Sequence, residues 1–182
     1  GSKIYSDRLI DLNNNKFEDL FEKEINQSEL NLTAGRSVVC VDRNGDGAYG
    51  IYVANYGGPT RFYELIRDGM HRAYVLDGDK FKDISTSPYN DPTKIRTVIS
   101  ADFDNDGYDE IFMNNIGEPN KLFKVIEGGE FKEIKMENGL ETVGLGTGAA
   151  VADVDGDGIL ELLVSHGESG FQPLTLYKAD IK

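Results

Sequence analysis

A nine-residue acidic pattern occurs three times in this chain and constrains its fold more than any other feature. The clearest copy runs from Asp102 to Glu110 and holds five carboxylates, a second runs from Asp153 to Glu161, and a weaker one runs from Asp42 to Gly50. So many carboxylates in one short loop repel one another at neutral pH unless a cation lies among them. Oxygen ligands on alternate residues, with glycine at the sixth place for a sharp turn, are typical of Ca²⁺-binding loops. We therefore expect a recurring calcium loop to be the repeat unit.

The spacing predicts which atoms of each loop bind the metal. They are the side chains at places one, three and five, the backbone carbonyl at place seven and the carboxylate at place nine. The expected metal ligands are Asp42, Asn44, Asp46, Asp102, Asp104, Asp106, Tyr108 (carbonyl), Glu110, Asp153, Asp155, Asp157, Ile159 (carbonyl) and Glu161. The first loop has Gly50 at place nine, so it lacks a ligand and is expected to bind most weakly or to stay empty. Mg²⁺ is disfavoured, because it demands tighter octahedral geometry and keeps its waters.

The sequence around the loops predicts strands. The first aspartates of the loops, at positions 42, 102 and 153, are 60 and 51 residues apart, which is the size of a propeller blade. Short runs rich in β-branched and aromatic residues, bounded by turn residues, flank each loop and predict strands paired as hairpins. The expected strands are residues 37–41, 51–55, 61–65, 80–84, 97–101, 111–115, 121–125, 130–134, 148–152, 162–166 and 174–177. The predicted fold is all-β, with three four-stranded antiparallel blades, of which the last stops after three strands.

We expect a single β-propeller-type domain over residues 3–182. Its repeats cover about residues 35–85, 95–135 and 146–180. Residues 3–20 match strands three and four of a preceding or closing blade, and residues 20–34 predict a linker with at most one or two helical turns. The favoured interpretation is a section of a larger ring; a compact three-unit protein and a ring closed by a second chain remain alternatives. Residues 1–2 (Gly-Ser) are interpreted as a cloning scar.

Two competing interpretations of these glycine-rich segments fail. An EF-hand needs helices on both sides and a bidentate Glu at the twelfth position, where this chain has Val53, Met113 and Val164. The glycines between Gly144 and Gly148 fit a dinucleotide fingerprint only nominally, because they precede a strand and no helical pattern follows them. We expect them instead to allow a close approach of the backbone as it enters the first strand of the third unit.

Composition and charge limit the function. A formal net charge of −13 argues against nucleic acids and anionic membrane surfaces as partners, because both would be repelled. No apolar run approaches the roughly 20 residues of a membrane span. Multi-carboxylate calcium loops fit an extracellular protein, where Ca²⁺ is abundant, and Asn26 and Asn31 begin glycosylation sequons. The lone Cys40 lies in an apolar run and is expected to be a buried structural thiol.

An enzymatic activity is not expected. Neither His71 nor His166 has the partners of a catalytic triad or a zinc cluster. Carboxylates suited to glycoside chemistry are abundant, but those in the loops are expected to hold Ca²⁺ and are therefore poor proton carriers. The alternative to a non-catalytic module is a carbohydrate-binding or carbohydrate-active propeller, in which Tyr74, Tyr89 and Phe171 would contact sugar.

The loops, each followed by a strand and in two units by a Gly-Gly-Pro or Gly-Glu-Pro turn, resemble the FG-GAP (VCBS) repeats of integrin-type β-propellers. A closer similarity, to the cartilage acidic protein family, rests on residues 34–42, 52–56, 96–106, 165–169 and 172–174. This resemblance implies a secreted or cell-surface calcium-binding propeller used for protein interaction or adhesion, with the metals on the face opposite the usual ligand-binding side. The implied partner is an extracellular protein or glycan. The incomplete strand count separately leaves open self-association with a second copy that completes the ring. The chain differs from the family in having fewer blades and no C-terminal family domain.

Overall fold

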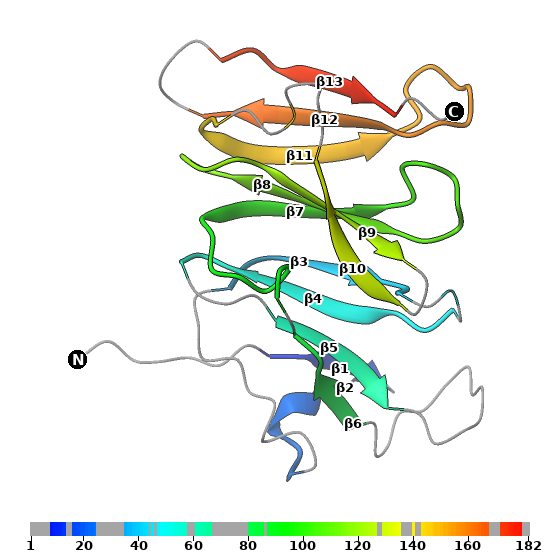
Figure 1. Cartoon of the computed structure of the whole chain (residues 1–182). Helices are drawn as coiled ribbons and strands as arrows, with labels where there is room; N and C mark the ends of the chain where they lie inside the picture. The colour runs from blue at the N-terminus through cyan, green and yellow to red at the C-terminus, as the bar shows by residue number, and fades with distance from the viewer. Residues whose placement is uncertain are drawn as a thin grey trace.

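The computed structural model shows an all-β protein. It describes residues 8–13, 16–24, 35–43, 45, 47–57, 61–66, 80–85, 87–126, 129–135, 140, 143–167 and 172–179. This part of the chain forms thirteen strands and one short 3-10 helix (Figure 1). All strand pairs are antiparallel. The predicted fold class is therefore confirmed.

The strands group into one hairpin and three sheets. The hairpin is β1 (Ile10–Asn13) and β2 (Lys16–Asp19), followed by the 3-10 helix η1 (Leu20–Glu22). The first sheet is β3 (Gly35–Val41), β4 (Gly50–Asn55), β5 (Arg61–Ile66) and β6 (Lys80–Asp83). The second sheet is β7 (Ile95–Ala101), β8 (Glu110–Asn115), β9 (Lys121–Ile126) and β10 (Glu130–Ile134). The third sheet is β11 (Gly146–Ala152), β12 (Glu161–His166) and β13 (Thr175–Lys178). Every strand expected from the sequence is present, and its ends differ by at most two residues.

The three sheets stack as neighbouring blades. Within each sheet the strands follow one another in sequence order, and the sheets lie one above the other with the hairpin below them (Figure 1). The first strands of the sheets are neighbours, because β7 contacts both β3 and β11. Among the described residues the stack does not close into a ring (Figure 1).

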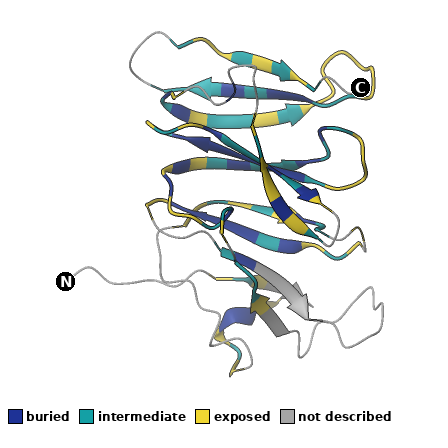
Figure 2. Ribbon diagram, viewed as in Figure 1, coloured by how far each residue is buried: buried dark blue, intermediate teal, exposed yellow. Residues whose placement is uncertain are grey.

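Two apolar layers hold the sheets together. The layer between the first and second sheets includes Tyr52, Phe62 and Met113, and the layer between the second and third includes Phe112 and Val164. The second sheet thus has both faces covered, and all six residues of its strand β8 are buried (Figure 2). The near-continuous apolar run of β8 is therefore a strand buried on both faces.

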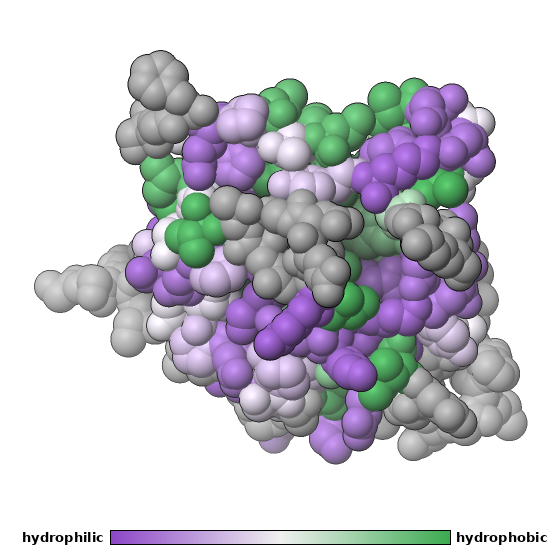
Figure 3. All heavy atoms as spheres, turned by 45° about the horizontal axis from the view of Figure 1, so that its top comes forward, coloured by the Kyte–Doolittle hydropathy of each residue, from purple (hydrophilic) through white to green (hydrophobic). Residues whose placement is uncertain are grey.

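Among the described residues, only one of the two faces of the third sheet is covered by another sheet. Its outer face carries the row Ala150, Leu163 and Leu176, which the strand register places side by side. Leu176 and the nearby Leu174 are exposed. The surface view turns this side of the stack forward and shows apolar residues gathered along its upper edge (Figure 3).

Two predictions about single residues are wrong. Cys40 is exposed, because alternation along β3 turns it away from Val39 and Val41, which pack toward the second sheet. Tyr89, proposed to contact sugar, is buried with its ring against those of Phe62 and Phe131. It is therefore a core residue of the layer between the first and second sheets.

The glycine-rich approach to β11 serves the purpose that the sequence predicted. A Cβ on Gly146 would lie 1.9 Å from Asn114 Oδ1 and 2.6 Å from the Asn115 carbonyl oxygen. Only glycine therefore fits where β11 crosses the end of β8. The segment begins a strand and is not a phosphate-binding turn.

The 3-10 helix η1, which follows the N-terminal hairpin, covers the other side of the stack. Leu20 and Phe21 are buried against Val53 of the first sheet. In the described part of the chain, no helix has the length and apolar character of a membrane span. Several residues singled out in the sequence lie outside the described residues: Asn26, Asn31, His71, Tyr74 and Phe171.

Candidate metal centres

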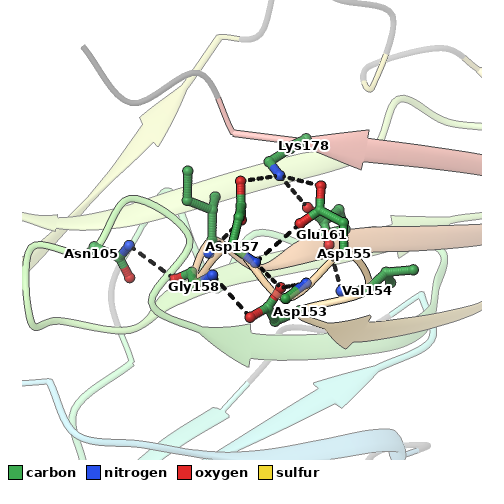
Figure 4. Close-up of polar contacts among 10 residues, drawn as sticks. Asn105, Asp153, Val154, Asp155, Asp157, Gly158, Glu161 and Lys178 are labelled. Atoms are coloured by element: carbon green, nitrogen blue, oxygen red, sulfur yellow. Dashed lines mark hydrogen bonds and ion pairs between the residues drawn. The ribbon is translucent and has the colours of Figure 1, made fainter.

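The three acidic loops connect the first and second strands of their sheets and are neighbours in space. The Asn105 side chain of the second loop donates a hydrogen bond to the Gly158 carbonyl of the third, at 3.3 Å (Figure 4). The Tyr108 ring of the second loop lies against Gly45 of the first, since a Cβ on that glycine would be 3.1 Å from the ring. The repeat thus brings the acidic loops together along one side of the stack.

The aspartate at place one shapes each loop. Asp102 accepts hydrogen bonds from the backbone N–H groups of Asp106 (3.1 Å) and Gly107 (2.9 Å). Asp153 accepts the equivalent bonds from Asp157 (3.1 Å) and Gly158 (2.9 Å). The glycines at place six have positive φ angles, 91° at Gly107 and 86° at Gly158, which residues with a Cβ rarely adopt. The turn is therefore shaped by hydrogen bonds and backbone conformations within the loop itself.

The glutamate at place nine is the unusual member of each cluster. Glu110 is 1% exposed and Glu161 is 3% exposed, because each begins the central strand of its sheet beneath the loop. One oxygen of each accepts a backbone hydrogen bond, from Phe103 at 2.9 Å and from Val154 at 2.7 Å. A carboxylate is rarely buried to this extent unless it is paired with a cation.

Two compact clusters of carboxylates result. Asp102, Asp104 and Glu110 each offer one oxygen within 4.8 Å of the others. Asp153, Asp155 and Glu161 do the same in the third loop. In the second loop, Asp104 Oδ1 and Glu110 Oε1 are buried and accept no hydrogen bond from the part of the chain that the structure describes. These two oxygens are available to a cation, as calcium ligands must be.

A lysine from the third strand of the same sheet reaches each cluster. Lys124 Nζ forms ion pairs with Asp104 and, at 2.7 Å, with Asp106. Lys178 Nζ lies 2.8 Å from Asp155, 2.6 Å from Asp157 and 3.0 Å from Glu161 (Figure 4). Neither lysine was predicted from the loop sequences. The signal was the strand register, because Lys178 is the partner of Glu161 and Lys124 holds the same position relative to Glu110.

The electrostatics follow from burial and from these lysines. Burial raises the pKa of Glu110 to about 7, because a carboxylate taken out of water loses hydration. The Lys124 ammonium lowers the pKa of Asp106, and the Lys178 ammonium lowers that of Asp157. The acids at place five are therefore ionised at neutral pH. At Glu110 the nearby positive charge of Lys124 is too weak to offset the effect of burial on the pKa.

The predicted ligands at place five, and Asp42 of the first loop, accept backbone hydrogen bonds within their own loops. The Asp106 and Asp157 side chains accept hydrogen bonds from the N–H groups at place seven, those of Tyr108 (3.0 Å) and Ile159 (2.9 Å). In the first loop, Asp42 Oδ2 accepts a hydrogen bond from Gly47, at 2.8 Å. The other two ligands predicted for that loop, Asn44 and Asp46, lie outside the described residues.

Comparison with known proteins agrees with this geometry. The model of a family described as FG-GAP-like repeat matches residues 102–164, which run from the second loop to the central strand of the third sheet. The chain carries an FG-GAP-like repeat. The resemblance to FG-GAP repeats is thereby confirmed. The prediction that these loops connect strands, and are not EF-hands between helices, is confirmed by the structure.

The chain is also similar to three curated proteins named cartilage acidic protein 1. The human protein is 29% identical over an alignment that includes 99% of this chain and 45% of the relative. The mouse protein is 41% identical over 155 residues, 80% of this chain and 23% of the relative. The Xenopus tropicalis protein is 41% identical over 153 residues, 79% of this chain and 22% of the relative. The chain therefore spans less than half the length of these relatives.

Proposed function

We propose that this chain is a non-catalytic, extracellular β-propeller module that binds Ca²⁺ structurally and serves protein interaction or adhesion. The observation that carries the calcium proposal is the second loop, where a buried glutamate and an aspartate present oxygens that accept no hydrogen bond from the described residues. The third loop supports it with the same set of acids at equivalent places.

The donor chemistry favours Ca²⁺ over other metals. The clusters offer carboxylate oxygens, without histidine or cysteine, and hard oxygen donors suit Ca²⁺ and Mg²⁺ rather than Zn²⁺. Ca²⁺ accepts six to eight oxygens in a flexible shell, which a loop with carboxylates and carbonyls can supply. The predicted ligands of the second and third loops would hold the ion and pin the hairpin; the first loop would bind most weakly.

The interaction proposal is supported by the relatives and by the surface. The name of the relatives, cartilage acidic protein 1, points to a tissue matrix outside cells and to an acidic protein. A net charge of −13 fits that description. The apolar outer face of the third sheet supports a ring completed by further blades or by another copy. Under this proposal the metals stabilise blades whose other surfaces bind the partner.

Calcium titration tests the proposal. We expect two Ca²⁺ ions to bind per chain by calorimetry, with a third bound weakly or not at all, and Mg²⁺ to bind more weakly. The double variant Asp102→Asn/Asp104→Asn should lose one ion and Asp153→Asn/Asp155→Asn the other. Glu133→Gln, which removes an exposed acid on β10, should lose neither.

The same variants can be followed by thermal unfolding. Ca²⁺ at a hundred times Kd stabilises by about 2.7 kcal/mol per site, which raises Tm by roughly 5–10 °C in a chain of this size. An unchanged melting curve in EGTA would contradict the calcium proposal. Crosslinking in extracellular medium, with Ca²⁺ or EGTA present, tests for a calcium-dependent partner.

A further inference from the structure

Each acid-rich loop with a glutamate at place nine has a lysine across the sheet from it. Lys178 is the register partner of Glu161. Ile111 pairs with Phe123, so Lys124 stands opposite Glu110 in the same way. We call Lys124 and Lys178 the loop lysines.

The first sheet has neither member of this pair. Place nine of its loop is Gly50, and Ile51 pairs with Tyr63, so the register sets Glu64 opposite Gly50. Lysine therefore accompanies the buried glutamate in two repeats and is replaced by an acid where the glutamate is missing. If these lysines only stabilised the sheet or kept the protein soluble, their presence would not depend on a glutamate at place nine of the loop.

The loop lysines place their positive charge where a bound cation would need to be. The Lys178 ammonium lies within 3.0 Å of carboxylate oxygens from places three, five and nine, and these are three of the ligands proposed for Ca²⁺. Lys124 contacts the acids at places three and five of its own loop. An ammonium and a Ca²⁺ ion cannot hold the same oxygens at once, because their charges repel and calcium ligands must approach to about 2.4 Å.

The loop lysines can move away from the acids once another cation neutralises the loop. Their side chains are 26% and 35% exposed, so solvent is within reach of both ammonium groups. A lysine side chain is a flexible four-carbon stem with a strongly hydrated end. The backbone turn is meanwhile held by the aspartate at place one, which neither lysine contacts in the described structure.

We propose that Lys124 and Lys178 are internal counter-cations, which neutralise the metal-free loops and which Ca²⁺ must displace. This inference rests on the proposed calcium binding and concerns its control. The lysines keep the metal-free hairpins folded and reduce calcium affinity. The sites would then fill at the calcium concentrations found outside cells, about 10⁻⁴ to 10⁻³ M for extracellular modules.

The test replaces each loop lysine by the uncharged and similarly long methionine. In Lys124→Met and Lys178→Met, calorimetry should show tighter Ca²⁺ binding at the altered loop, by about 10- to 100-fold, because a positive charge within a few ångströms of the ion has been removed. The charge-preserving Lys124→Arg should bind Ca²⁺ more weakly than Lys124→Met. Lys121→Met is the matched control on β9, since Lys121 has no carboxylate contact in the described part of the chain.

Melting temperatures separate competition from a purely structural role. Without Ca²⁺ the methionine variants should melt below the unaltered protein, and at saturating Ca²⁺ they should melt at the same temperature or above it. An equal loss of Tm in both conditions, or an unchanged or weaker Kd in Lys124→Met and Lys178→Met, would overturn the inference. Failure of the proposed function looks different: no variant, including the methionine variants, would bind Ca²⁺.

Discussion

The second and third sheets carry loops of the same design on sheets that are covered differently. Both loops use an aspartate at place one, a glycine of positive φ at place six and a buried glutamate at place nine. Their central strands differ, because all six residues of β8 are buried, whereas β12 is only half-buried at several positions. The third sheet lacks a neighbour on its outer side among the described residues.

This difference separates local from long-range causes. Loop shape follows from hydrogen bonds within about five residues, so it is the same in both sheets. Burial follows from what lies above and below a sheet, so equivalent residues differ. Phe112 and Leu163 show it best: both are the third residue of a central strand, yet Phe112 is fully buried and Leu163 is not.

The largest expected effect is the loss of folding stability when Phe112 or Leu163 is replaced by alanine. Phe112→Ala should destabilise the protein by about 3–5 kcal/mol, because it leaves a cavity between the second and third sheets. Leu163→Ala should cost only about 1 kcal/mol, since its side chain is partly in water already. Urea unfolding of the 182-residue chain measures both. Equal losses would show that the outer face of the third sheet is covered in solution, for example by a second copy, and sedimentation would then reveal an oligomer.

An intermediate effect concerns the two buried glutamates without metal. Glu110→Gln should leave stability in EGTA unchanged or raise it by about 1 kcal/mol, because it removes a buried charge with one unsatisfied oxygen and its amide can donate to nearby carboxylates. Glu161→Gln should lower stability by about 1 kcal/mol, because Lys178 loses a charged partner. Chemical unfolding in EGTA at pH 7 gives the comparison. A loss of stability in Glu110→Gln together with no loss in Glu161→Gln would contradict the different pairing of the two sites. Both variants should lose one Ca²⁺ ion.

The smallest effect is expected at place four, where the loops differ in residue but share a backbone conformation. Asn105 has a φ of 57° and Gly156 a φ of 77°. Asparagine tolerates this region, so Asn105→Gly and Gly156→Asn should each change stability by less than about 1 kcal/mol. Asn105→Val should cost about 1–2 kcal/mol, because a β-branched residue is strained there. A cost in Asn105→Gly as large as in Asn105→Val would instead assign the importance of Asn105 to its bond with Gly158.

Much of the fold could be predicted because its causes are local. Turn residues, alternate apolar residues and the spacing of the loops predicted each strand, and the same pattern brought Asp102, Asp104 and Glu110 into one cluster. The chain order of the strands also gave the sheets, since each strand pairs with the next. These features depend on hydrogen bonds and turns that a short segment can form by itself.

The failures involve residues whose surroundings come from elsewhere in the chain. Cys40 has an apolar sequence context but faces away from the second sheet, and Tyr89 lies in a polar segment but packs into the core. The contact of Lys178 with Glu161 required the register of two strands, which no single loop sequence contains.

By itself, the sequence determined the three acidic loops, the strands around them and the family they resemble, because an aspartate, a glycine and their neighbours shape a turn within a few residues. Only the tertiary structure decided which glutamate oxygens lack a partner, which lysines reach the acids and which faces of the sheets are covered. Those properties depend on the surfaces that other strands present, so they exist only once the sheets have stacked.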